Sequence, residues 1–291
     1  MTIPRAARSA AALALVLGLA ACAEHTGRVA EPPEAAPSSA AEPPAEPGAL
    51  VLRVEYTGGF VPPSVLAGRL PIISVYADGR VLSEGPVAAI YPGPALPNVQ
   101  VQQLDPAQVR DLADRAVAAG VTETGDLGSP PVADAPNTRF TLVTADGTTV
   151  REVYALWETP QGDVGGVTPD QAAARERLSD FLGTLTDATL ADPQPVPYVP
   201  SSIAAVVSPW VDPDDGLTQA ELRWPGPALP GEPAGPGVGC VTADAEQTRA
   251  LLAAAESANA ATPWVAPDGT RWSVVFRPLL PDETGCADLI D

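Results

Sequence analysis

Carboxylates, hydroxyls and arginines are the side chains with which this 291-residue sequence could do chemistry. Its only histidine is His25, which lies in the predicted tether described below, so the part expected to fold has no imidazole. All 16 basic residues are Arg, so the chain contains no Lys. Ser-His-Asp and Cys-His catalysis need an imidazole base, whereas Schiff-base chemistry and Walker-type phosphate loops need a lysine. The sequence therefore predicts no catalytic residue of these classes, no metal site that depends on imidazole and no cofactor.

Paired carboxylates are the remaining route to catalysis, because two Asp or Glu residues at a suitable separation can cleave a glycosidic bond. Glu55, Asp78, Glu152 and Glu158 lie near the expected ends of strands, where acids commonly serve as solvated edge or turn residues. No signature singles out a pair, and clefts that cleave glycans usually carry more aromatic residues than the 5% of this chain. We therefore keep a carboxylate-dependent hydrolase of envelope glycans only as the second hypothesis for function, after the binding role given at the end of this subsection.

The densest acidic cluster is Asp212-Pro213-Asp214-Asp215-Gly216, which has the charge of a calcium loop but a different spacing. Calcium loops supply ligands from alternating positions, whereas here two acids are adjacent and a proline stiffens the segment. We expect a surface turn and no metal.

The cysteines Cys240 and Cys286 both lie near the C-terminal end. Two such thiols in an oxidising compartment are expected to pair. They are not in a Cys-x-x-Cys arrangement, so we predict a structural disulfide rather than a redox centre.

The N-terminal segment has the layout of an export signal. Arg5 and Arg8 precede an apolar run over residues 10–20, which is too short to span a bilayer as a helix. The run ends in Leu-Ala-Ala followed by Cys22, which resembles the lipobox of bacterial lipoproteins. That resemblance implies that residues 1–21 are a removable signal peptide and that Cys22 becomes an N-terminus acylated with fatty chains such as palmitate.

A lipidated Cys22 implies anchoring at the outer face of the cell membrane, because two or three fatty chains hold a protein there stably. Loss of Arg5 and Arg8 with the signal peptide would change the formal charge from −20 to −22. The field of such a chain repels phosphates, so nucleic acid is excluded as a partner. The use of Arg without Lys, with abundant Ala and Pro, resembles uncharacterised lipoproteins of actinobacteria, and this resemblance implies no activity.

Composition divides the rest of the chain. Residues 22–48 are rich in Ala, Pro and Glu and have little to bury, which predicts a disordered tether. Residues 49–191 and 201–291 carry strand and helix patterns and are predicted to form a first and a second α+β lobe. Residues 192–200 contain four prolines and are predicted to be the linker between the lobes.

Three helices are expected, because three capping-box patterns each precede apolar residues at helical spacing. The helices should begin at Asp105-Pro106, Thr168-Pro169 and Asp244-Ala245. Asp-Gly pairs at residues 78–79, 146–147 and 268–269 separate alternating runs and predict three hairpins with two-residue turns. Hairpins favour antiparallel sheets.

The hexapeptide Pro-Gly-Pro-Ala-Leu-Pro occurs twice, at residues 92–97 and 225–230, each time after an aromatic residue. Similar helix starts and strands follow both copies in the same order, which favours an internal duplication. The two segments suggest rigid recognition loops, for which the candidate binding residues are Tyr91, Leu96, Trp224 and Leu229. The simpler explanation is that each segment is a stiff connection whose aromatic and leucine fill the core of its own copy.

Together these features predict an α+β protein with mostly antiparallel sheets, about three helices and two related lobes. The function predicted first is a non-enzymatic binding or interaction module of the cell envelope, held off the membrane by its tether. Its partner would be an envelope protein or a glycan, because the side chains lack the usual nucleophiles, bases and metal ligands.

Overall fold

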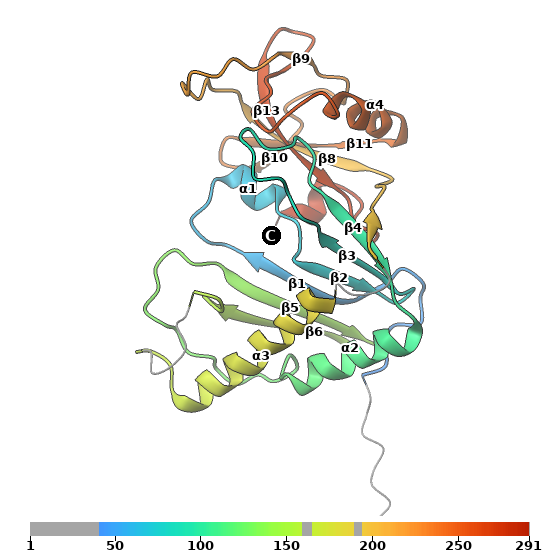
Figure 1. Cartoon of the computed structure of the whole chain (residues 1–291), viewed down its shortest axis with the longest axis vertical. Helices are drawn as coiled ribbons and strands as arrows, with labels where there is room; N and C mark the ends of the chain where they lie inside the picture. Colours follow the sequence, from blue (N-terminus) through green and yellow to red (C-terminus); the bar gives the residue numbers. More distant parts are fainter. Residues whose placement is uncertain (1–40, 159–164, 189–193, 291) are drawn as a thin grey trace, which may run out of the picture. The chain divides into compact units, whose positions relative to one another are not determined.

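The computed structural model describes residues 41–158, 165–188 and 194–290, which belong to one compact unit, Ser39–Asp291. They form two mostly antiparallel sheets with helices packed against them, which confirms the predicted α+β class (Figure 1). The predicted signal peptide, Cys22 and His25 lie outside the described residues. Among the helices described, none is both long enough and apolar enough to cross a membrane.

The first sheet has seven strands in the order β6-β5-β1-β2-β3-β4-β7, and every neighbouring pair is antiparallel. Its strands are β1 (Leu50–Thr57), β2 (Ile73–Tyr76), β3 (Arg80–Glu84), β4 (Val99–Gln103), β5 (Asn137–Thr144), β6 (Gly147–Tyr154) and β7 (Val196–Pro197). Alternate residues such as Phe140 and Leu142 are buried on one face, because successive side chains of a strand point to opposite faces. That face forms a core with α2 (Pro106–Ala118) and α3 (Pro169–Ala188).

The second sheet has six strands in the order β10-β11-β8-β13-β12-β9, of which β9 and β12 are parallel and the other neighbours antiparallel. Its strands are β8 (Ile203–Pro209), β9 (Leu222–Arg223), β10 (Glu232–Gly235), β11 (Val238–Ala243), β12 (Trp264–Val265) and β13 (Arg271–Pro278). One face packs against α4 (Ala245–Ala255) around Trp224, Trp264 and Phe276, whose ring centroids lie 5.5 to 6.3 Å apart. The other face packs against α1 (Pro63–Gly68) and the 3-10 helix η1 (Cys286–Leu289).

All three predicted capping boxes are present. Asp105 Oδ1 accepts hydrogen bonds from the N–H groups of Ala107 and Gln108, and the Gln108 side chain accepts one from the Asp105 N–H. The same reciprocal bonds join residues 168 and 171 before α3 and residues 244 and 247 before α4. These bonds satisfy N–H groups that the first turn of a helix leaves free, which explains why the helices begin there.

The predicted disulfide is present between Cys240 of β11 and Cys286 of η1. It closes a loop with a sequence separation of 46. The bond therefore fastens the C-terminal segment to a strand inside the second sheet.

The three predicted hairpins are present at the Asp-Gly pairs, and they join the antiparallel strands β2–β3, β5–β6 and β12–β13. The predicted turn length is wrong for the first and third hairpins. Gly79 and Gly269 have φ angles of 88° and 86°, and each N–H donates to the carbonyl three residues earlier, as in a three-residue loop. In the second hairpin Gly147 is the first residue of β6 and pairs with Thr144, so the two-residue turn consists of residues 145–146 and not of the predicted Asp146-Gly147 pair.

Segments cross between the two sheets, so the predicted arrangement as two related lobes is not confirmed. The predicted linker, residues 192–200, supplies β7, which pairs with β4 at the edge of the first sheet. The strands that flank α2 and α4, the helices that correspond in the predicted duplication, also occupy different positions in their sheets. Three strands separate β4 from β5, whereas β8 alone separates β11 from β13.

The last residues of the predicted tether contact the first sheet and its helices. The Ala41 N–H donates to Asp114 of α2 at 3.0 Å, and the Glu42 carbonyl accepts from the Ala145 N–H at 2.9 Å. The described chain therefore begins beside α2 and the β5–β6 turn, while residues 22–40 of the tether lie outside the described residues.

Candidate functional site

A cleft of about 770 Å³ lies between the two sheets. Volumes of roughly 300–1,000 Å³ are typical of sites that bind small molecules. Residues of β1, β2 and β3 line one side and β13 lines the other, while the β1–β2 connection and the first Pro-rich segment complete the walls. Most of the lining side chains are apolar, among them Val65, Val87, Leu96, Val274 and Phe276.

The first Pro-rich segment, residues 92–97, forms a wall of the cleft because it crosses to the second sheet. Pro94 forms an isolated bridge with Asn259, and the Ala260 N–H donates to the carbonyl of residue 93 at 2.9 Å. Leu96 packs against the core of the second sheet, as does Leu229 from the second segment. Both hexapeptides therefore close the same core, which corrects the expectation that each fills the core of its own copy.

The aromatic residues that precede the two hexapeptides have different environments. Trp224 is 4% exposed and donates its indole N–H to the Pro227 carbonyl at 2.6 Å. Tyr91 is 69% exposed, and its hydroxyl donates to Asp215 at 2.7 Å, a hydrogen bond that raises the pKa of Tyr91. Of the four candidate binding residues, Leu96 is the one that lines the cleft.

Two charged residues lie among the apolar walls of the cleft. Arg69 donates from Nη1 to the carbonyls of Tyr56 at 3.2 Å and Gly58 at 3.1 Å, which fastens the start of the β1–β2 connection. Glu84 ends β3, and partial burial raises the pKa of its carboxyl group. Burial and the nearby Glu158 also raise the pKa of Tyr56, so this hydroxyl stays neutral at physiological pH.

Arg69 and Glu84 are not among the residues predicted from the sequence. One sequence signal points to their region. The β1–β2 connection runs from residue 58 to residue 72, much longer than a hairpin turn, and long ordered connections often carry function. The crossing of Leu96 to the second sheet has no comparable signal, because it depends on contacts between distant parts of the chain.

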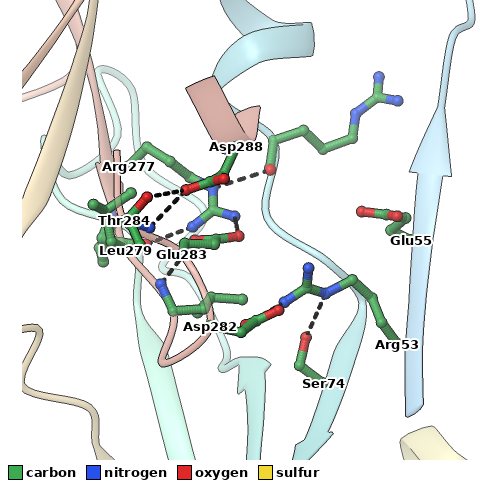
Figure 2. Close-up of polar contacts among 12 residues, drawn as sticks. Arg53, Glu55, Ser74, Arg277, Leu279, Asp282, Glu283, Thr284 and Asp288 are labelled. Carbon is green, nitrogen blue, oxygen red and sulfur yellow. Dashed lines mark hydrogen bonds and ion pairs between the residues drawn. The ribbon is translucent and has the colours of Figure 1, made fainter. Parts of the chain in front are cut away.

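Arg277, a member of a buried ion pair, links β13 to the β1–β2 connection, which are two walls of the cleft. Arg277 of β13 lies 2.7 Å from Glu283, and their side chains are 2% and 5% exposed. Arg277 Nε also donates to the Arg69 carbonyl at 3.2 Å, which ties β13 to the β1–β2 connection. Figure 2 shows Arg277 and Glu283 facing each other, with Arg53 reaching from β1 toward Asp282 nearby.

The carboxylates of this network are held by donors. Asp282 accepts from Arg53 and from the Tyr76 hydroxyl, both at 2.8 Å, and Glu283 accepts from the Leu280 N–H at 2.7 Å. Burial raises the pKa of Tyr76, and the charge of Asp282 adds to that effect, so the phenol keeps its proton. These contacts give both acids a structural role, because Asp282 joins the C-terminal segment to the first sheet and Glu283 joins it to β13.

Three of the four acids considered for glycan cleavage, Glu55, Asp78 and Glu152, are paired with arginines, and the fourth, Glu158, is exposed. Asp78 lies 2.7 Å from Arg80, and although burial acts to raise its pKa, the hydrogen bonds from Arg80 lower it. Arg139 lies 2.7 Å from Glu152 and 3.9 Å from Glu55. No observation on these residues favours an acid and base pair facing a shared substrate.

The acidic cluster at residues 212–216 forms an exposed turn. Asp212 accepts from the Asp214 N–H at 3.0 Å, and Asp215 accepts from the Leu217 N–H at 2.9 Å. Their carboxylates therefore stabilise the turn itself. Within the described ranges, His, Cys, Asp and Glu side chains do not gather in groups of three or more that could hold a metal ion.

Comparisons with protein-family models, with curated proteins and with solved structures gave no match for this chain. Its function is therefore inferred from the cleft and from the N-terminal sequence.

Proposed function

We propose that this chain is a lipid-anchored extracytoplasmic protein that acts as a non-enzymatic binding module of the cell envelope. The observation that carries the proposal is the cleft between the sheets, which has the volume of a ligand site and mainly apolar walls. Removing apolar surface from water contributes about 25 cal/mol per Å² to binding. The proposed occupant is therefore an envelope component that buries an apolar part against these walls.

The walls of the cleft are fixed before a ligand arrives. Arg277, held by Glu283, ties β13 to the β1–β2 connection through its hydrogen bond to the Arg69 carbonyl, and prolines limit the conformations of residues 92–97. A site that is already ordered loses less conformational entropy on binding. This rigidity supports a role in recognition rather than in a reaction that requires closure.

The proposed location rests on the N-terminal sequence. The lipobox at Cys22 would place the folded unit outside the cytoplasm, and a disulfide such as Cys240–Cys286 persists in oxidising compartments. The strong negative charge would keep the unit away from anionic lipid headgroups.

Nile red, a neutral apolar dye, tests the cleft. We expect the dye to bind residues 22–291, which contain the described unit, with a rise in its fluorescence. Val65→Asp and Val87→Asp place a carboxylate at cleft positions that are 42% and 53% exposed. Each should weaken binding about tenfold, because a carboxylate loses water beside a bound apolar ligand.

Val211→Asp is the matched control, since residue 211 is 75% exposed and does not line the cleft. Thermal unfolding of each variant separates lost binding from lost folding. Equal dye affinity in the cleft variants and in Val211→Asp would contradict the proposed site.

A further inference from the structure

A second cavity, of about 410 Å³, shares no lining residue with the cleft. Its walls include Glu123, Gly125 and Asp126 from the α2–β5 connection, Arg151 from β6, and Arg177 from α3. The cavity therefore brings two guanidinium groups together beside the core of the first sheet.

Arg151 is the unusual member of this group. It is 6% exposed, and Nη2 donates to the Gly125 carbonyl at 3.1 Å. Its Nε and Nη1 atoms are buried and have no hydrogen-bond partner among the described residues. Buried donors of a charged group are nearly always paired in folded proteins, so a missing acceptor is a reason to expect a bound ion or molecule.

Arg177 lines the same cavity as Arg151 and is paired there with Glu123. Burial lowers the pKa of Arg151; the negative charge of Glu123 acts to raise it, and the positive charge of Arg177 acts to lower it. Both charged neighbours therefore lie close enough to influence Arg151. Arg177 contacts Glu123 at 3.3 Å, but the side chains are 46% and 52% exposed. Exposed pairs of this kind contribute little to stability, so this contact opens readily.

The acids around the cavity do not supply the missing acceptor. Asp126 accepts from the Gly128 N–H at 3.1 Å and from the Gln171 side chain at 3.0 Å, so both of its oxygens are engaged. Glu123 directs both of its oxygens to Arg177. Neither of these acids bonds to the buried donors of Arg151, and the third acid that lines the cavity, Asp170, makes no hydrogen bond with them either. Among the described residues Arg151 therefore lacks an acceptor that a bound anion could supply.

We propose that this cavity binds a small oxyanion, a phosphate or a carboxylate, held by Arg151 and Arg177. The planar guanidinium group offers parallel N–H donors that match two oxygens of such an anion. Entry of the anion displaces Glu123 from Arg177. The site is independent of the apolar cleft and of the function proposed for it.

Anion-dependent thermal unfolding of residues 22–291 tests the site, with sodium phosphate, sodium acetate and sodium chloride compared at constant ionic strength. Saturable binding should raise the unfolding temperature by about 3 °C at a tenfold excess over the dissociation constant. Arg177→Gln should abolish the saturable rise, whereas Glu123→Gln should strengthen binding about threefold by removing the competing carboxylate. The comparison of the unfolding temperatures in phosphate and in acetate shows which of the two oxyanions binds.

Arg110→Gln is the matched control, because Arg110 is an exposed residue of α2 that does not line the cavity. It should keep the full rise. Arg151→Met removes the buried donors at similar volume and should also abolish the rise; if this variant does not fold, Arg177→Gln and Glu123→Gln decide the question. An equal rise in chloride, or the same rise in wild type and Arg177→Gln, would overturn the proposal.

Discussion

Arg277 Nη2 lies 2.7 Å from Glu283 Oε1 in a pair that is almost completely enclosed. Removing one partner of such a pair leaves a charge buried without compensation. Arg277→Met should therefore lower the free energy of unfolding by about 3–5 kcal/mol, measured by urea denaturation. Arg271→Met on the same strand is the control, because its partner Glu221 and Arg271 itself are about half exposed and such pairs contribute about 0–1 kcal/mol.

A double variant, Arg277→Met with Glu283→Leu, should recover part of that loss, since apolar replacement of both partners is often neutral. Equal destabilisation by Arg277→Met and Arg271→Met would show that the first pair is accessible to water in solution.

Tyr76 should make the folded state sensitive to alkaline pH. Burial and Asp282 raise the pKa of Tyr76 above its usual value of 10.0. Below that value both the folded and the unfolded chain carry the protonated phenol, so the stabilisation is complete. Above it the unfolded chain loses the proton first, and stability falls as pH rises toward the higher folded pKa.

The urea concentration at the unfolding midpoint should therefore decrease as the pH is raised from about 9 to about 11. The decrease should be smaller in Tyr76→Phe. The chain has no Lys, so lysine titration does not obscure the result. An equal decrease of the urea midpoint with pH in wild type and in Tyr76→Phe would show that other tyrosines cause the effect.

The Cys240–Cys286 bond should stabilise the folded chain. A loop with a sequence separation of 46 corresponds to about 4 kcal/mol on the chain-entropy estimate, from which strain subtracts. Cys240→Ala with Cys286→Ala should lower the free energy of unfolding by about 2–4 kcal/mol, and a reducing agent should affect wild type but not this variant. Two alkylatable thiols in unreduced protein would refute the bond.

Cys22→Ala should remove the protein from the membrane fraction and leave unprocessed precursor, because the proposed lipid is attached to that thiol. Fractionation of cells with labelled palmitate measures both effects. The double variant at Cys240 and Cys286 is the control and should remain labelled. Unchanged membrane association of Cys22→Ala would exclude the lipid anchor.

Elements that depend on local signals were predictable from the sequence. The starts of α2, α3 and α4 follow from capping residues, and the hairpins follow from Asp-Gly pairs. The short helix α1 was missed because its N-cap, Pro62, makes no capping hydrogen bond with its side chain. The strand β7 was taken for part of a linker because it contains Pro197, yet a strand at the edge of a sheet tolerates proline.

Contacts between distant residues were not predictable in this way. The cleft depends on Leu96 crossing to the second sheet and on Arg277 reaching the Arg69 carbonyl, and neither contact leaves a periodic pattern. The orphaned donors of Arg151 likewise appear only once β6 is placed beside the α2–β5 connection.

Because Leu96 packs into the core of the second sheet, the chain cannot be cut between its two sheets without exposing apolar surface. An N-terminal fragment that ended within residues 192–200 would expose Leu96 to water. A C-terminal fragment that began there would have a cavity in its core where Leu96 packs. Recombination at the Pro-rich stretch would thus create two fragments that must find each other before either becomes complete.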